Sequence, residues 1–132
     1  MDWSIDYMEG DNYVKVTSSG IFSAPEHPAC FKKLFSCPFW KPGMNLLFDN
    51  RKLDFGQINL DKMRTTSFHF QSVSAQLGKG KVALLMNSLC NYGLGRQFQL
   101  LTEDELQCEL KVSTDEQETL DWLESKSKSV FA

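Results

Sequence analysis

Two short apolar runs constrain the fold of this chain more than any other feature. Each run is flanked by turn residues, and neither is long enough for a helix. Met44 to Phe48 ends at Asp49-Asn50, and Val82 to Met86 follows a Gly-Lys-Gly turn at 78–80. Runs of this length are typical of strands buried on both faces of a sheet. An amphipathic helical repeat fills residues 60–77 between them. Two buried strands joined through a helix predict parallel pairing with a right-handed crossover.

The remaining segments extend this alternation of strands and helices. A hairpin is predicted where period-two alternation runs on both sides of Glu9-Gly10-Asp11-Asn12. The predicted elements are the hairpin over 2–18, strands over 44–48, 82–86 and 106–112, and helices from Ser23 to before Pro38, over 60–77, over 92–105 and from the Thr114-x-x-Gln117 capping box onward. The predicted fold class is α/β, in the order β-β-α-β-α-β-α-β-α, with a mixed sheet of roughly five strands and four helices. We expect one domain over residues 1–125 and a short tail over 126–132.

Composition and charge exclude several classes of protein. A chain of 132 residues buries about two-thirds of its extended surface, which is enough for a core without a metal or a disulfide. Residues 31–64 carry seven Lys/Arg and three Asp/Glu, whereas residues 99–124 carry one Lys and nine Asp/Glu. Nucleic-acid binding favours a dominant basic surface, so we expect no nucleic-acid partner. Solvated helix faces and contacts with a partner both fit this uneven charge.

The sequence also indicates a reducing compartment and no integral membrane association. Cys30, Cys37, Cys90 and Cys108 include no C-x-x-C pair, so we expect buried free thiols and no metal. No apolar run approaches the roughly 20 residues that span a bilayer. Met1 to Ser4 has no basic n-region of a signal peptide. We therefore expect a cytoplasmic protein without a cofactor.

Three local patterns occur in order along the chain. They are Trp40-x-Pro42-Gly43-Met44-Asn45-x-Leu47-x-Asp49 before the central strand, Tyr92-Gly93-Leu94-Gly95-Arg96-Gln97-Phe98 at a helix start, and Thr114 to Leu123, ending Asp121-Trp122-Leu123, in the last helix. Together these patterns resemble the SpoIIAA-like family, relatives of the STAS (anti-sigma-factor antagonist) domains. The resemblance covers nearly the whole chain, and it implies an α/β STAS-like fold.

The phosphorylation switch of the anti-sigma-factor antagonists is not expected in this chain. In that family a serine after the central strand, in an Asp-Ser-Ser-Gly-type motif, is phosphorylated to change partner binding. The corresponding stretch here, Leu53 to Leu60, contains no Ser or Thr, and Asn59 lies closest to the phosphoserine position. Thr65, Thr66 and Ser67 fall inside the predicted helix, where a kinase reaches poorly.

Ligands of open α/β sheets bind beyond the carboxyl ends of the strands, so polar residues there are the candidate site. The candidates are Asp49 and Arg51 after the third strand, Asn87, Ser88, Asn91 and Tyr92 after the fourth, and Arg96 one turn into the next helix. Backbone N–H groups at that helix start and the Arg96 guanidinium would suit a carboxylate or phosphate. The alternative is that Arg96 pairs with Asp49 as a structural bridge while Asn87 and Asn91 cap the helix.

Catalytic chemistry is not indicated by any pattern in the chain. His27 lies between Glu26 and Pro28 and is expected to be exposed, and His69 falls off the apolar stripe of its helix. Neither histidine is placed by sequence to activate a serine, and no G-x-S-x-G, P-loop or dinucleotide motif is present. We therefore expect that the protein is not an enzyme.

One basic and aromatic segment suggests a second kind of function. Phe22, Phe31, Phe35, Phe39 and Trp40 crowd around Lys32, Lys33 and Lys41. This composition fits a peripheral lipid-contacting face, and it also fits a helix whose aromatic stripe packs on the sheet while its lysines face water.

The leading hypothesis is a non-enzymatic regulatory or protein-interaction module of the STAS-like type, with an unknown protein partner and without the phosphoserine switch. The alternative is a small-ligand or lipid-binding module that uses the Phe-rich first helix. Self-association as a homodimer is compatible with both, because small domains of this shape can pair through an edge strand or a helix face.

Overall fold

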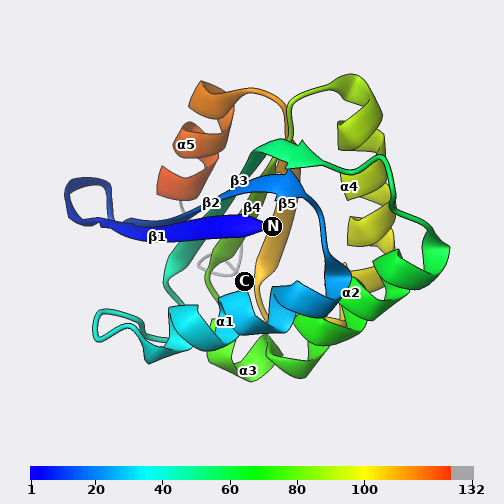
Figure 1. Ribbon diagram of the computed structural model, residues 1–132. Coiled ribbons are helices and arrows are strands. Elements are labelled where there is room, and N and C mark those ends of the chain that lie inside the picture. Colours follow the sequence, from blue (N-terminus) through cyan, green and yellow to red (C-terminus); the bar gives the residue numbers. More distant parts are fainter. Residues whose placement is uncertain (126–132) are drawn as a thin grey trace.

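A computed structural model describes residues 1–125 of the chain, which form one five-stranded sheet with helices on both faces (Figure 1). The strands are β1 (Asp2–Met8), β2 (Tyr13–Ile21), β3 (Asn45–Asp54), β4 (Lys81–Leu85) and β5 (Glu109–Ser113). The helices are α1 (His27–Ser36), α2 (Leu60–Ser72), α3 (Ser74–Leu77), α4 (Leu89–Thr102) and α5 (Glu116–Glu124). The predicted tail, residues 126–132, lies outside the described residues.

The topology is the predicted mixed sheet. The strands lie side by side in sequence order, β1-β2-β3-β4-β5. The hairpin strands β1 and β2 pair antiparallel, and each later strand pairs parallel to the one before it. Parallel pairing requires a crossover between neighbouring strands, and the helices supply it. The predicted fold class and element order are therefore confirmed.

The core lies mainly on one face of the sheet. On that face Val16, Phe48 and Leu84 pack against side chains from α1, α2 and α4, including Leu34 and Phe70. The opposite face is covered by α5, whose Leu123 packs against a smaller cluster. That cluster contains Tyr13, Leu47, Ala83 and Leu85. Since β3 and β4 contribute to both clusters, their apolar runs are the doubly buried strands that the sequence predicts.

The first helix packs on the sheet rather than presenting its aromatic side chains to solvent. Phe31 and Leu34 are buried, whereas Lys32 and Lys33 are exposed. This is the arrangement expected when one helix stripe must cover a sheet. The segment was interpreted either as a lipid-contacting face or as a helix whose aromatic stripe packs on the sheet. For Phe31 the structure shows the second arrangement.

Several elements differ in length from the prediction. The strand predicted over 106–112 spans only Glu109–Ser113, since a 3₁₀ turn occupies Glu103–Glu105 and the chain pairs with β4 only from Glu109 onward. The strand predicted over 44–48 continues to Asp54, because β2 also runs on and pairs with it as far as Ile21, after a register shift between Thr17 and Ser19. The helix predicted over 60–77 breaks at Val73 into α2 and α3. Hydroxyl side chains that bond to backbone carbonyls, as Ser72 does to His69, compete with the helical pattern near this break.

Helix α1 begins at His27, after a 3₁₀ turn over Ala24–Glu26, rather than at Ser23. Two later helix starts also differ from the prediction, and each follows from a capping side chain. Helix α4 begins at Leu89 because the Ser88 hydroxyl accepts a hydrogen bond from the Asn91 backbone N–H at 3.1 Å. Neither Asn87 nor Asn91 is the cap. Helix α5 begins at Glu116 because the Asp115 carboxylate accepts from the Glu118 N–H at 2.9 Å, one residue later than the predicted Thr114 cap.

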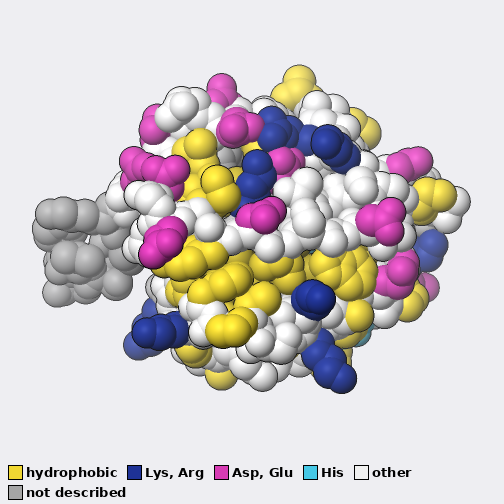
Figure 2. Space-filling view, turned by 60° about the vertical axis from the view of Figure 1, so that its left-hand side comes forward, with side chains coloured by type: hydrophobic (Ala, Val, Ile, Leu, Met, Phe, Trp, Pro, Cys, Tyr) yellow, Lys and Arg dark blue, Asp and Glu magenta, His cyan; other side chains and the backbone are white. Residues whose placement is uncertain are grey.

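The edge strand β1 brings apolar side chains to the surface. Trp3, Ile5 and Tyr7 are half-buried against the larger core cluster. Figure 2, in which the hairpin side of the molecule comes forward, shows a band of apolar side chains across this face. Among residues 1–125, no helix is long and apolar enough to cross a membrane.

Replacement of Gly78 by alanine is expected to lower the free energy of unfolding by about 2 kcal/mol. Gly78 has a φ of +75°, which side chains with a Cβ rarely adopt, and an added Cβ would meet the backbone of Pro42 and Gly43. Chemical denaturation measures the change. The matched control is Gly10→Ala, since an added Cβ there meets nothing within 4 Å. Equal stabilities of the two variants would contradict this account.

Candidate functional site

Asp49 and Arg51 form an ion pair on one face of the sheet, in which Asp49 is buried and the Arg51 side chain stays partly exposed. Both residues belong to β3, since the strand is longer than predicted, and they share the face covered by α5. The Arg51 Nε and Nη2 atoms donate to the two Asp49 carboxylate oxygens at 2.9 and 2.8 Å. Lys15 Nζ lies 3.8 Å from the same carboxylate, and Arg51 also contacts Glu116 at 2.7 Å, at the start of α5. This network joins the sheet to α5.

The charges of this network are satisfied internally. Burial of the Asp49 carboxyl would raise its pKa, but the hydrogen bonds from Arg51 and the charges of Arg51 and Lys15 outweigh burial and hold the pKa below its usual value. The hydrogen bond to Asp49 is the main reason that the pKa of Arg51 is raised. Both groups therefore stay ionised and paired at neutral pH, and neither offers a free charge to a ligand.

The polar residues after β4 organise the loop into α4. The Asn87 amide donates to the Arg51 backbone carbonyl at 3.0 Å, and the Asn91 amide donates to the Asn87 carbonyl oxygen at 2.8 Å. Ser88 caps α4, and Tyr92 is half-buried in its first turns. The structure thus brings Asn87, Ser88 and Asn91 together at the carboxyl edge of the sheet, beside the Arg51 backbone.

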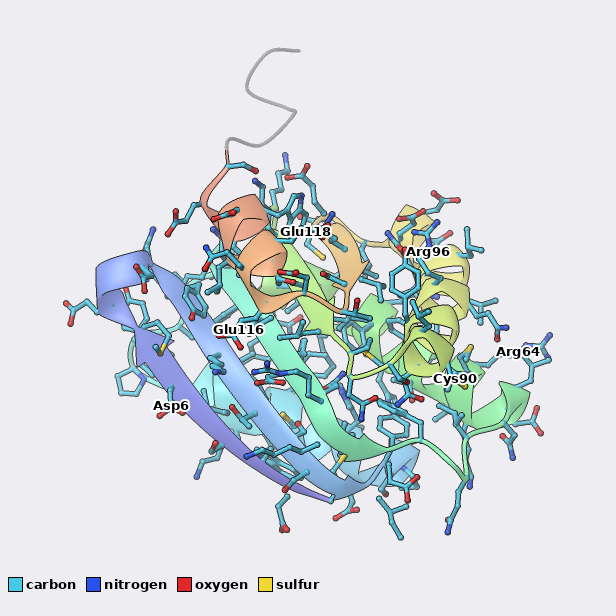
Figure 3. The ribbon with its side chains drawn as sticks, turned by 90° about the horizontal axis from the view of Figure 1, so that it is seen from above. Asp6, Arg64, Cys90, Arg96, Glu116 and Glu118 are labelled. Carbon is cyan, nitrogen blue, oxygen red and sulfur yellow. The ribbon has the colours of Figure 1, made fainter. Side chains whose placement is uncertain are left out.

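Arg96 lies apart from these residues. Its guanidinium donates to the Gln99 side chain, which in turn donates to the Leu110 carbonyl of β5 at 2.7 Å. The interpretation of Arg96 as the partner of Asp49 is therefore wrong. The reason is that α4 covers the face of the sheet opposite to the one that bears Asp49. Figure 3 shows Arg96 on α4, well separated from Glu116.

An apolar cavity of about 60 Å³, open at one side, lies between the sheet and helices α2 and α4. It is placed at the carboxyl ends of β3 and β4, where ligands of α/β sheets bind. The cavity is lined by Phe22, His27, Phe48, Asn50, Phe55, Ile58, Met63, Thr66, Phe70, Leu84, Met86, Leu94, Gly95 and Phe98. Among these residues only His27, Asn50 and Thr66 have polar side chains, so the walls are almost entirely apolar.

His27 was expected to be exposed. Instead, it is packed among aromatic rings in the wall of this cavity. Its ring centroid lies 5.0 Å from that of Phe31, 5.3 Å from that of Phe70 and 6.0 Å from that of Phe48. Its Nδ1 atom is buried without a hydrogen-bond partner in the part of the chain that the structure describes. Burial, with a smaller effect of His69, lowers the pKa of His27 to about 4, so the imidazole is neutral at pH 7.

Sequence reasoning missed this histidine although a signal was present. Glu26 and Pro28 on either side suggested a surface position. However, His27, Phe31 and Leu34 are spaced i, i+4, i+7, which places them on one helical stripe. The spacing therefore predicts that His27 lies on the buried face of its helix. It does not predict that a cavity exists beside it.

The buried cysteines are unreactive. Burial raises the pKa of the Cys30 thiol to about 12 and that of Cys108 to about 11, which suppresses the reactive thiolate. Cys90 is exposed, contrary to the expectation of buried thiols. Within residues 1–125, no cluster of three or more His, Cys, Asp or Glu is placed to hold a metal ion.

These features, a mixed five-stranded sheet with its helices and motifs in the predicted order, define a SpoIIAA-like α/β fold. A solved structure with this fold is the crystal structure of an uncharacterised protein of the DUF3478 family from Shewanella loihica PV-4. It aligns with a TM-score of 0.60 and 18% sequence identity over 92% of each chain. At this identity the likeness establishes the fold, and the predicted SpoIIAA-like fold is confirmed. No family model and no curated protein matches the sequence.

Proposed function

We propose that this chain is a non-enzymatic binding module, and that its ligand is a small uncharged molecule whose apolar end enters the cavity between the sheet and α2 and α4. The observation that supports this proposal most strongly is an apolar cavity lined in part by His27, a residue whose buried Nδ1 atom has no hydrogen-bond partner among residues 1–125. A buried polar atom without a partner costs about 1–3 kcal/mol, so its presence calls for a reason. A ligand that bonds to His27 would supply that reason.

The size of the cavity limits what can enter. At about 30 Å³ for each water-sized group, about 60 Å³ holds roughly two such groups. Pockets that enclose drug-sized ligands are larger, roughly 300–1,000 Å³. The cavity therefore takes one end of a ligand, and a ring or longer chain requires the half-buried Phe22 or Phe55 at its wall to move.

The polar groups select an uncharged ligand. A neutral imidazole has one donor and one acceptor nitrogen, and the Asn50 amide offers both functions as well. Either can pair with a hydroxyl, carbonyl or amide group. Since no Lys or Arg among residues 1–125 lines the cavity, a carboxylate would lose its hydration without a compensating charge. Alcohols, phenols and ketones with a short apolar end are the chemical class that fits.

A regulatory protein-interaction role is the second candidate, and exposed apolar side chains on α2 and α4 favour it. Phe68 is 67% exposed on α2, and Leu89 and Leu100 are 82% and 68% exposed on α4. Contiguous apolar patches mark docking surfaces, and these side chains are the exposed apolar groups that a partner would cover. A phosphoserine switch is not part of this candidate, because Leu53 to Leu60 contains no Ser or Thr.

The ligand-binding proposal is tested by calorimetric titration with p-cresol, a neutral ring with one hydroxyl, and with p-toluate, its carboxylate counterpart. We expect p-cresol, whose ring enters with displacement of the half-buried Phe22 or Phe55, to bind with a Kd below about 1 mM, and p-toluate to bind at least ten-fold more weakly. Ile58→Trp, which fills part of the cavity from its wall, should weaken p-cresol binding at least ten-fold.

The matched control is Leu60→Trp, two residues along the chain. Leu60 is 53% exposed and does not line the cavity, so this variant should bind p-cresol like the unmodified protein. Equal binding of p-cresol by both tryptophan variants would place the ligand elsewhere and contradict the proposal.

A further inference from the structure

Strand β1 forms an edge of the sheet that carries only part of the usual protection against pairing. It is paired with β2 along all seven of its residues, and within residues 1–125 no strand lies on its other side. An edge strand presents unpaired backbone N–H and C=O groups, which proteins usually shield with charged side chains (Lys above all), Pro or a bulge. The charged side chains of β1 are Asp2 and Asp6, both on its exposed face. The segment Asp2–Met8 contains neither Lys nor Pro, and its pairing with β2 has no register shift.

The two faces of β1 differ in character. Trp3, Ile5 and Tyr7 lie on the face of the larger core cluster and are only half-buried there. Tyr7 stacks on Phe39 with ring centroids 5.2 Å apart, so the apolar surface continues beyond the strand. The other face of β1 bears the exposed residues Asp2, Ser4 and Asp6.

We propose that two copies of this chain pair antiparallel through β1, about a two-fold axis at Ile5, so that the two five-stranded sheets form one continuous sheet. In this register Ile5 faces Ile5 of the partner subunit, and Trp3 faces Tyr7 of the partner subunit. Aromatic and β-branched pairs directly opposite one another stabilise antiparallel strands. The half-exposed apolar face of one copy thus covers that of the other.

Charge selects this register over its neighbours. With the axis at Ile5, Asp6 faces Ser4 of the partner subunit and Asp2 faces Met8 of the partner subunit, so acidic residues are not directly opposed. An axis at Ser4 would set Asp2 against Asp6 of the partner subunit, and an axis at Asp6 would set that residue against its own copy. Like charges directly opposite one another are destabilising. Of the three axes at Ser4, Ile5 and Asp6, only the one at Ile5 therefore leaves no two acidic residues of β1 directly opposed.

The test places opposite charges at Ser4, an exposed position that faces Asp6 of the partner subunit in this register. Ser4→Lys creates two attractive pairs per dimer, and Ser4→Glu creates two repulsive pairs. Sedimentation equilibrium of the full chain should show a wild-type dimer. The dimer dissociation constant should fall about 2- to 30-fold for Ser4→Lys and rise by a similar factor for Ser4→Glu.

Two control variants separate this local effect from the net charge of −3. Gln97→Lys and Gln97→Glu make the same changes of charge at an exposed position on α4, far along the sheet order from β1. They should leave the dissociation constant unchanged. A wild-type chain that stays monomeric at millimolar concentration, or Ser4 variants that behave like the Gln97 variants, would overturn the proposal.

Discussion

The Phe70→Ala variant is expected to lose about 3–5 kcal/mol of its free energy of unfolding, as is usual for a large aromatic side chain removed from a core. Phe70 is 2% exposed and lies at the centre of the aromatic cluster. Its ring centroid is 4.9 Å from those of both Phe31 and Phe98, in edge-to-face geometry. Because Phe70 also lines the cavity, the deletion should enlarge the cavity, and p-cresol should restore part of the lost stability.

The matched control for this variant lies two residues earlier in the same helix. Phe68 is 67% exposed, so Phe68→Ala should change the free energy of unfolding by no more than about 0.5 kcal/mol. Urea denaturation of the three proteins, with and without p-cresol, measures both effects. A loss below about 1 kcal/mol for Phe70→Ala would show that this ring does not organise the core.

Acid should destabilise the protein through His27, by up to about 3 kcal/mol between pH 6.5 and pH 4. The pKa of His27 is about 4 in the folded state, below its unfolded value of about 6.5. In this window the unfolded chain therefore binds more protons, and stability falls as the pH falls. Asp49 acts in a lower window, because its lowered folded pKa removes stability only as the pH falls below its unfolded value of about 4.

His27→Phe isolates this contribution, since a phenyl ring fits among the surrounding aromatic rings and does not titrate. At pH 7 the variant should be at least as stable as the unmodified protein, because the unpaired Nδ1 atom is removed. The stability difference between the two proteins should then widen as the pH falls to 4.5. Parallel stability curves for the two proteins would contradict a neutral, buried His27.

The order of strands and helices could be predicted from the sequence because it depends on local spacing. The apolar runs before Asp49 and after Gly80 have the length of buried strands, and the alternation in residues 2–18 identifies the hairpin. Boundaries were less predictable where partners far apart in sequence decide them. Strand β3 extends to Asp54 because β2 continues beside it, and no pattern within residues 49–54 reveals this.

The candidate site was predicted less well, for two physical reasons. Asp49 and Arg51 are polar residues that ended an apolar run, so they suggested a loop, but in a strand residues two apart share a face and can pair. One of the two alternatives for Arg96 paired it with Asp49, yet α4 lies on the other face of the sheet from Asp49. Which face a helix covers is a property of the tertiary fold.

The cavity could not be predicted from the sequence at all. Its wall is assembled from segments that contain Phe22, Phe48, Met63 and Phe98, which lie far apart along the chain. Each of these residues matches the pattern of an ordinary core position. A void arises only from how well their side chains interlock, and packing of this kind has no signature in periodicity or composition.

The most direct test of the proposed ligand site uses the methionine methyl groups as reporters. The chain has five methionines, of which Met63 and Met86 line the cavity, whereas Met1, Met8 and Met44 do not. In protein labelled with ¹³C at these methyl groups, titration with p-cresol should shift the NMR signals of Met63 and Met86 along a saturating curve and leave the other three in place. Signals of Met63 and Met86 that stay fixed, or that move together with those of Met8 and Met44, would contradict a ligand site in this cavity.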